Sequence, residues 1–130
     1  MAQPPALVTD GSDPELWLIA QAAQRAVDEL GGGHREHVYQ RALAHLLRAD
    51  RSVITEVDVA FRLLDGTVVG SGRADLVVGD MVVEVKVGRT KCREQYARQA
   101  RHYKRFLGLG GPAVVVIFSD VANECAVYAV

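Results

Sequence analysis

The chain has 130 residues, of which 49% are hydrophobic and 24% are charged, and its formal net charge is −1. This length allows one domain with a single modest core, and the composition is typical of an ordinary soluble globular protein. No run of about 18 apolar residues is present, so the sequence predicts no membrane-spanning helix. The first 13 residues contain neither Lys nor Arg, so we expect a flexible tail rather than a secretory signal, followed by one domain at residues 14–130.

The spacing of cysteines and histidines indicates neither a disulfide framework nor a zinc site. Cys92 and Cys125 lie far apart and form no CxxC pair, so we expect free thiols in a reducing compartment. The four histidines are not spaced as zinc ligands are. The sequence therefore predicts an intracellular protein without structural zinc.

The near-neutral net charge hides one strongly basic segment. Residues 86–105 contain eight Lys or Arg and one Glu, a net charge of +7 that leaves −8 for the remaining residues. Such a segment is typical of a surface that binds a polyanion, and equally of a solvated helix face. Charge alone does not decide between the two.

The chain begins with two predicted helices. Residues 14–30 have helical apolar spacing, with Asp13 as the N-cap, a proline in the first turn and three glycines after the last turn. Residues 34–50 place Tyr39 and Leu43 on one apolar stripe. We therefore expect two amphipathic helices.

The following segments are predicted to form strands. Residues 53–64 alternate between apolar and polar, which is typical of a half-buried strand, and Asp65–Gly66 predicts a tight turn. The next strand begins at Thr67 and is interrupted by GSG at residues 70–72, where we expect a bulge. Three further elements are a helix at residues 91–111, a buried strand at 113–118 and a last strand at 124–130. The order ααβββαββ predicts an α/β (α+β) fold, a central mixed β-sheet flanked by helices.

A predicted hairpin around residues 79–80 gathers charged side chains. A two-residue loop with Gly first suits a type II′ turn, and counting outward from it places Asp75 opposite Glu84. The same register places Arg73 opposite Lys86. Strand alternation then puts all four side chains on one face of the hairpin, away from most of its apolar residues.

Two carboxylates that face each other across a ladder have Cβ atoms about 5 Å apart and repel each other. Arg73 and Lys86 would offset this repulsion in an ordinary charge-balanced face, which the hairpin alone favours. A divalent cation is the alternative, because Mg²⁺ prefers carboxylate and phosphate oxygens. Glu36, in the first turn of the second helix, is expected to point toward the sheet, and a third carboxylate exceeds what charge balance needs.

The third predicted helix carries further polar residues. Gln99 and Tyr103 lie four residues apart and therefore share a face. Arg98 and Arg101 lie on a neighbouring face from which they would reach phosphates. Periodicity alone allows Gln99 to be merely a solvated polar residue.

In combination, these residues resemble the PD-(D/E)XK nuclease superfamily, and within it the small GxxExxY family. The family's name motif corresponds to GHREHVY at residues 33–39, its metal motif to Asp75 followed by EVK at 84–86, and its later QxxxY motif to QARHY at 99–103. The motifs stand in the expected order over most of the chain. Ala74 precedes the aspartate where the superfamily's name has a proline, at a position that varies widely.

The resemblance implies a restriction-endonuclease-like core and a metal-dependent deoxyribonuclease. Asp75, Glu84 and the backbone carbonyl of Val85 would hold Mg²⁺ or Mn²⁺, and Glu36 would complete the ion's shell or orient a water. Lys86 would position or deprotonate the attacking water, or stabilise the charge that develops on the phosphate. The catalytic residues would thus be Glu36, Asp75, Glu84 and Lys86. Six side chains would contact the substrate: Tyr39, Arg73, Arg98, Gln99, Arg101 and Tyr103.

Two other classes of function are compatible with the sequence. The first is a catalytically silent nuclease-like module that binds nucleic acid or a protein, and the second is a purely structural domain whose acidic pair is neutralised by Arg73 and Lys86. Metal binding separates the nuclease from both. The apolar C-terminal strand with Tyr128 could pair at an open sheet edge, so we also expect a homodimer acting on DNA.

Overall fold

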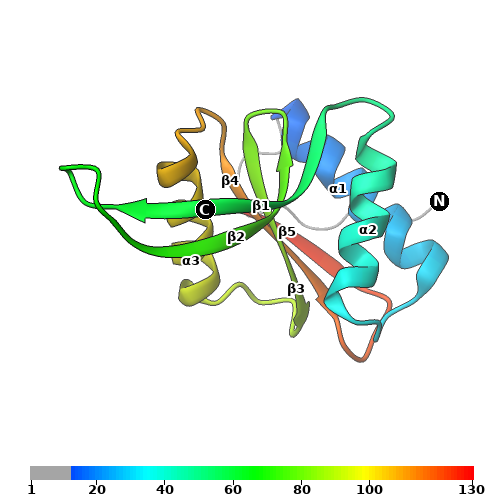
Figure 1. The fold of residues 1–130 in the computed structure, drawn as a ribbon. Helices are drawn as coiled ribbons and strands as arrows, with labels where there is room; N and C mark the ends of the chain where they lie inside the picture. The colour runs from blue at the N-terminus through cyan, green and yellow to red at the C-terminus, as the bar shows by residue number, and fades with distance from the viewer. Residues whose placement is uncertain (1–12) are drawn as a thin grey trace.

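The computed structural model describes residues 13–130, and its elements follow the predicted order (Figure 1). The tail predicted at residues 1–13 lies outside the described residues except for Asp13. No helix among residues 13–130 is long and apolar enough to cross a membrane. The helices and strands are α1 (Pro14–Leu30), α2 (Glu36–Leu47), β1 (Val53–Arg62), β2 (Val68–Val78), β3 (Met81–Gly88), α3 (Glu94–Leu107), β4 (Ala113–Ser119) and β5 (Cys125–Ala129).

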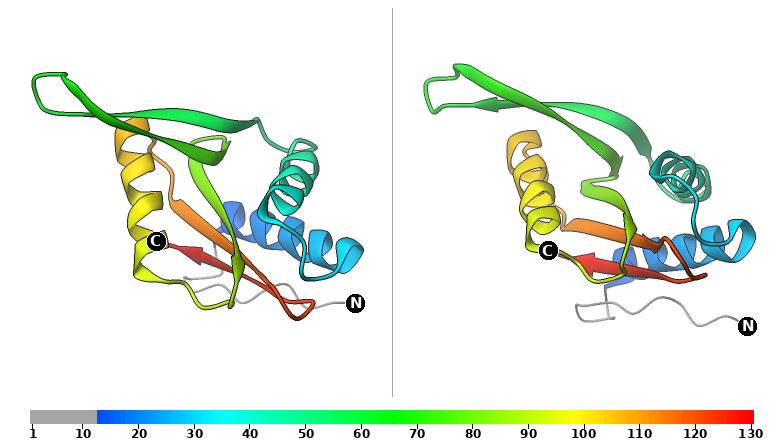
Figure 2. Two further views of the ribbon diagram at one scale, coloured as in Figure 1. Left: turned by 60° about the horizontal axis from the view of Figure 1, so that its bottom comes forward. Right: turned by 90° about the horizontal axis from the view of Figure 1, so that it is seen from below.

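The five strands form one mixed sheet in the order β1-β2-β3-β4-β5. Neighbouring strands are antiparallel except for β3 and β4, which run parallel on either side of α3 in the sequence. Helices α1 and α2 cover one face of the sheet and α3 covers the other (Figure 2). The predicted mixed sheet flanked by helices is therefore confirmed.

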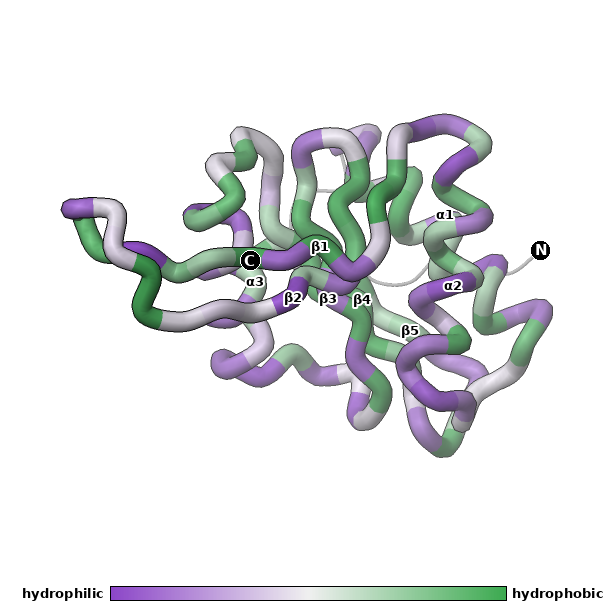
Figure 3. The backbone as a smooth tube through the Cα atoms, in the orientation of Figure 1, coloured by the Kyte–Doolittle hydropathy of each residue, from purple (hydrophilic) through white to green (hydrophobic). Residues whose placement is uncertain are grey.

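The apolar residues of the central strands build the core. Every residue of β4 is buried, as the continuous β-branched run predicts for a strand covered on both faces. Figure 3 shows the hydrophobic residues along these central strands, while the connecting loops are mostly hydrophilic. Leu76, Val83 and Val85 face α1 and α2, which leaves the alternate positions of β3 for the α3 side.

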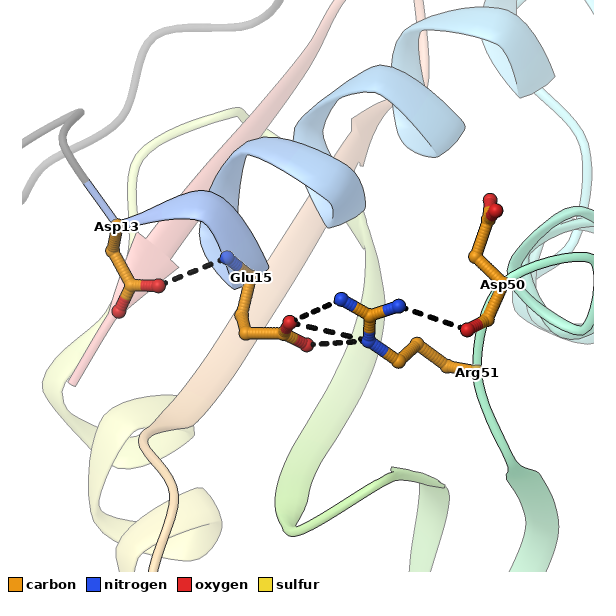
Figure 4. A network of polar contacts seen from close by, with 4 residues as sticks. All are labelled: Asp13, Glu15, Asp50 and Arg51. Atoms are coloured by element: carbon orange, nitrogen blue, oxygen red, sulfur yellow. Dashed lines mark hydrogen bonds and ion pairs between the residues drawn. The ribbon is translucent and has the colours of Figure 1, made fainter.

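The start of α1 is fixed by polar contacts (Figure 4). Asp13 is the N-cap, because its carboxylate accepts a hydrogen bond from the Glu15 N–H at 2.9 Å. Glu15 in turn pairs with Arg51, with Nε at 3.0 Å from Oε2. This half-exposed pair ties α1 to the segment after α2, and its contribution to stability is small, at most about 1 kcal/mol.

Gly72 of the GSG stretch serves aromatic packing, and the bulge predicted at residues 70–72 is wrong. Residues 70–72 pair regularly with β1, and the register shifts one step farther out, between Phe61 and Arg62. A Cβ on Gly72 would lie 2.7 Å from the Tyr103 ring, and one on Gly70 would lie 3.5 Å from the Phe61 ring. Gly72 is therefore required because α3 packs an aromatic ring directly on the β2 backbone.

The β2–β3 hairpin follows the predicted register only near its turn. The three pairs from Val78–Met81 to Leu76–Val83 are formed as predicted. Farther from the turn, β2 stays paired with β1 and leaves β3. Arg73 therefore pairs with Asp58 of β1, with Nε at 3.4 Å from Oδ1. The predicted position of Arg73 opposite Lys86 is wrong, because β1 holds β2 along nearly its whole length.

The turn before α2 gives a test of this architecture. Gly32→Ala would place a Cβ 2.1 Å from the Ala122 carbonyl oxygen in the β4–β5 loop. We expect a loss of about 1–3 kcal/mol in the free energy of unfolding, measured by urea denaturation, because backbone must move. Gly110→Ala is the control, since its Cβ would meet only Asp80, at 3.8 Å. An equal effect of both changes would contradict the close approach of the two loops.

Candidate active site

The candidate site lies where β2 leaves β3. The Asp75 carboxylate accepts a hydrogen bond from the Val85 N–H at 2.8 Å, and the Glu84 carboxylate accepts one from the Asp75 N–H at 2.7 Å. Both contacts lie just beyond the last ladder pair, Leu76–Val83. The two side chains thus take over backbone donors that the diverging strands no longer satisfy.

Burial puts an electrostatic strain on this pair. Glu84 is only 1% exposed and Asp75 is partly buried. Burial, and after it the charge of the Asp75 carboxylate, raises the pKa of Glu84 to about 8. Burial also raises the pKa of Asp75, while the Val85 N–H and the Lys86 charge act against that rise. A proton or a cation at the pair would therefore lower its free energy.

Glu36 approaches this pair from α2. It stands in the first turn of the helix, and its Oε1 accepts a hydrogen bond from the Val87 N–H of β3 at 3.3 Å. Its charge raises the pKa of both Asp75 and Glu84. The side chain is exposed yet reaches the sheet. Glu36 therefore adds negative charge near the pair without being buried with it.

Lys86 lies on the α3 side of β3 and is held there by α3. Its Nζ donates to Gln99 Oε1 at 3.2 Å and lies 5.4 Å from the centroid of the Tyr96 ring. Gln99 Nε2 donates in turn to the Tyr103 hydroxyl at 3.1 Å. Lys86, Gln99 and Tyr103, all predicted from the sequence as site residues, thus form one series of hydrogen bonds. The lysine stands at the end of this series nearest the carboxylates.

Two residues near the carboxylates were missed from the sequence. Gln40 lies one turn after Glu36 on α2 and donates to the Asp75 carbonyl at 3.1 Å, a spacing that could have indicated it. Glu56 of β1 stands at the step of the β1–β2 register that would face Asp75, where no pair forms. Its φ is +54°, and its charge raises the pKa of Asp75. Nothing in the local sequence indicates this conformation.

The structure places the three arginines predicted as substrate contacts in three different surroundings. Arg98 is exposed beside Gln99 and Tyr103, in one hollow with them. Arg101 lines a different hollow with Tyr128 and donates to Glu94 at 2.6 Å. Exposed Arg73 lies on β2 and is paired with β1. Gln99 thus contacts Lys86 directly, and Arg98 shares the hollow that Gln99 lines.

Tyr39 has a structural position, which corrects its prediction as a substrate contact. It is fully buried and stacks on Phe118 with ring centroids 4.1 Å apart. Its hydroxyl donates to the Gly31 carbonyl at 2.6 Å and accepts from the His34 N–H at 3.2 Å. With no exposed surface and both hydrogen-bonding roles used, Tyr39 holds the turn that precedes Glu36.

Comparison with known families decides the classification. The family model described as PD-(D/E)XK nuclease superfamily matches residues 15–125. The chain belongs to the PD-(D/E)XK nuclease superfamily. No curated protein and no solved structure matches it. Membership of the GxxExxY family within this superfamily stays a prediction.

Nucleases of this superfamily generally use divalent metal ions, and the donors present fit such an ion in kind. Among residues 13–130, no three His, Cys, Asp or Glu side chains are grouped so that they alone would hold a metal. Asp75 and Glu84 nonetheless each use one oxygen on a backbone N–H. Neither of their other carboxylate oxygens is a fully buried atom without a hydrogen-bond partner. Two hard carboxylates, of which Asp75 is partly exposed and Glu84 is buried, suit Mg²⁺ in kind, because Mg²⁺ completes its shell with water and phosphate.

The raised pKa of Glu84 makes the stability of the metal-free protein depend on pH. The folded state keeps the Glu84 proton up to about pH 8, whereas an ordinary Glu releases it near 4.5. The folded state therefore binds more protons in this window, and stability falls as the pH rises through it. We expect the melting temperature in EDTA to fall from pH 5 to pH 8, and to fall less in Glu84→Gln.

The control for this measurement is Glu29→Gln, which changes an exposed carboxylate on α1. It should leave the pH profile as in the wild type. An unchanged slope in Glu84→Gln would show that Glu84 titrates normally and is not strained by burial.

Proposed function

We propose that the chain is a Mg²⁺- or Mn²⁺-dependent deoxyribonuclease whose centre is the Asp75–Glu84 pair with Lys86. The observation that carries this proposal is the interlocked, buried carboxylate pair at the point where β2 leaves β3. Two acids buried side by side are costly for a merely structural domain, because burial and mutual repulsion disfavour their ionised forms. A cation-binding function accounts for their presence.

The ligands of the ion would be Asp75, Glu84 and the backbone carbonyl of Val85, with Glu36 at the outer side of the shell. The hydrogen bonds to Val85 and Asp75 fix both carboxylates against the backbone. The bound ion would acidify a water and shield the charge of the phosphodiester. Glu36, held on the Val87 N–H, would orient that water.

Lys86 would stabilise the negative charge that develops on the phosphate. An ammonium group has three donors, and one of them is used on Gln99. The remaining donors can serve a phosphate oxygen. Gln99, itself held by Tyr103, keeps Nζ in place, so little reorganisation is needed when the charge appears.

The electrostatics of α3 support a polyanionic substrate. The basic segment at residues 86–105, with its net charge of +7, includes the end of β3 and most of α3. Positive charge on this side of the sheet would attract phosphates toward Lys86. DNA as the substrate, a homodimer and an intracellular location stay predictions. The edge strand β5 is the surface at which two copies would pair.

Cleavage assays test the proposal. With Mn²⁺ present, the wild type should cut at least one of single-stranded, duplex or branched DNA. Glu84→Gln and Lys86→Ala should each lower the rate about a hundredfold or more, because each removes a group that stabilises the transition state. Asp28→Asn, an exposed change on α1, should cut normally.

Two outcomes would contradict this reading. Retention of full activity by Glu84→Gln would place the reaction elsewhere. Binding of DNA without cleavage in any metal tested would indicate the silent nuclease-like module instead.

A further inference from the structure

A hollow lies between α3 and the outer part of the β1–β2 hairpin at residues 59–72. We call this part of the hairpin the β1–β2 arm, and Figure 2 shows its backbone extending past α3. We call the hollow the α3 hollow. It is lined chiefly by Phe61, Ser71, Arg98, Gln99, His102 and Tyr103. Its volume of about 370 Å³ falls within the ~300–1,000 Å³ range of sites for small organic groups.

Aromatic rings form one wall of the α3 hollow. Phe61 of the arm and Tyr103 of α3 have ring centroids 6.1 Å apart and nearly parallel planes, at 3°. Phe61 is partly exposed, and Phe106 supports it edge-on at 5.2 Å. Gly72 lets the Tyr103 ring lie against bare backbone. The Phe61 ring is thus fixed in place from behind while part of it faces outward.

The hydrogen-bond chain from Lys86 fixes what Tyr103 offers to the hollow. An ammonium group only donates, so Gln99 must turn its oxygen to Lys86 and its amide nitrogen to Tyr103. The Tyr103 oxygen is then an acceptor in this contact. Within residues 13–130 the hydroxyl has no acceptor for its own proton, which is therefore available to an oxygen in the hollow.

The charge of the α3 hollow is positive. Arg98 is exposed at its rim and forms no ion pair with any of the residues 13–130. His102 lies beside it, and no Asp or Glu is among the lining residues. A guanidinium and a phenolic O–H together suit the oxygens of a phosphate.

The α3 hollow borders the candidate active site at Gln99. Gln99 lines the hollow and also accepts the hydrogen bond from Lys86 at 3.2 Å. A strand whose reacting phosphate lies at Lys86 would therefore place an adjacent nucleotide in the hollow.

We propose that the α3 hollow binds one unpaired nucleotide of the substrate strand, next to the phosphate that is cut. Arg98 and the Tyr103 hydroxyl hold its phosphate, and the Phe61 ring stacks on its base. This inference rests on the proposed nuclease function and narrows its substrate to strands with an unpaired segment. The faces of a base in a duplex are occupied by its neighbours, so an aromatic wall of this kind is useful only to an unstacked base.

Fluorescence anisotropy in EDTA tests the proposal without any cleavage. The probes are a fluorescein-labelled oligothymidylate, a duplex of the same length, and an oligomer of the same length whose sugars carry no bases. The wild type should bind oligothymidylate more tightly than the duplex. Phe61→Leu should weaken oligothymidylate binding about tenfold, the expected loss for one base stacked on an aromatic ring, and leave binding of the abasic oligomer unchanged.

Arg98→Gln and Arg101→Gln form a matched pair of charge changes on α3. Arg98→Gln should weaken oligothymidylate binding and reduce the slope of log affinity against log salt by about 0.7, as the loss of one phosphate contact on a single strand does. Arg101→Gln removes the same charge from an arginine that lines the other hollow and is paired with Glu94, so it should change the slope less than Arg98→Gln does. In Phe61→Leu, leucine keeps an apolar side chain against Tyr103 and Phe106. Thermal melts would confirm that all three variants are folded.

Several results would overturn the proposal. One is an equal loss of oligothymidylate affinity in the two arginine variants. Another is an equal loss of affinity of Phe61→Leu for oligothymidylate and for the oligomer without bases. The third is tighter binding to the duplex than to oligothymidylate. The proposed function fails separately. If the protein binds the probes as described but never cuts DNA, the nucleotide site stands and the proposed nuclease function is wrong. If the protein cuts DNA but does not bind the probes as described, the nuclease function stands and the nucleotide site is wrong.

Discussion

Two backbone N–H groups lose their ladder partners where β2 turns away from β3, and the site is built around their replacement by carboxylates. Asp75 and Glu84 accept these hydrogen bonds reciprocally. The exchange satisfies the backbone, and it buries two acids side by side, so that the pKa of each is raised. The hairpin consequently holds two acids at a place where positive charge would stabilise their ionised forms.

The sheet brings different helices to this one place from its two faces. From the face of α1 and α2, Glu36 reaches the backbone of β3 and Gln40 reaches that of β2. From the other face, α3 fixes Lys86 through Gln99. The buried Tyr39 and the close contact of Gly32 with the β4–β5 loop hold the start of α2. Carboxylates and lysine are therefore positioned by separate contacts on the two faces of the sheet.

Much of this arrangement could be predicted from the sequence, because local signals fix it. The two-residue turn at Gly79–Asp80 sets the register that brings Asp75 and Glu84 together, and alternation along β3 assigns Lys86 to the same face. The position of Arg73 could not be predicted in this way. Its partner depends on how far β2 stays with β1 rather than with β3, and this is settled by tertiary packing. The φ of +54° at Glu56 likewise has no local sequence signal, and the burial of Tyr39 depends on Phe118, far away in the chain.

The central claim is that the Asp75–Glu84 pair is a cation site. Calorimetric titration of Mn²⁺ into chelator-treated protein, alone and with a short DNA strand, tests it most directly. The account predicts saturable binding in the wild type under at least one of the two conditions, and its loss in Glu84→Gln. Absence of binding in the wild type under both conditions, or equal binding in Glu84→Gln, would contradict the account.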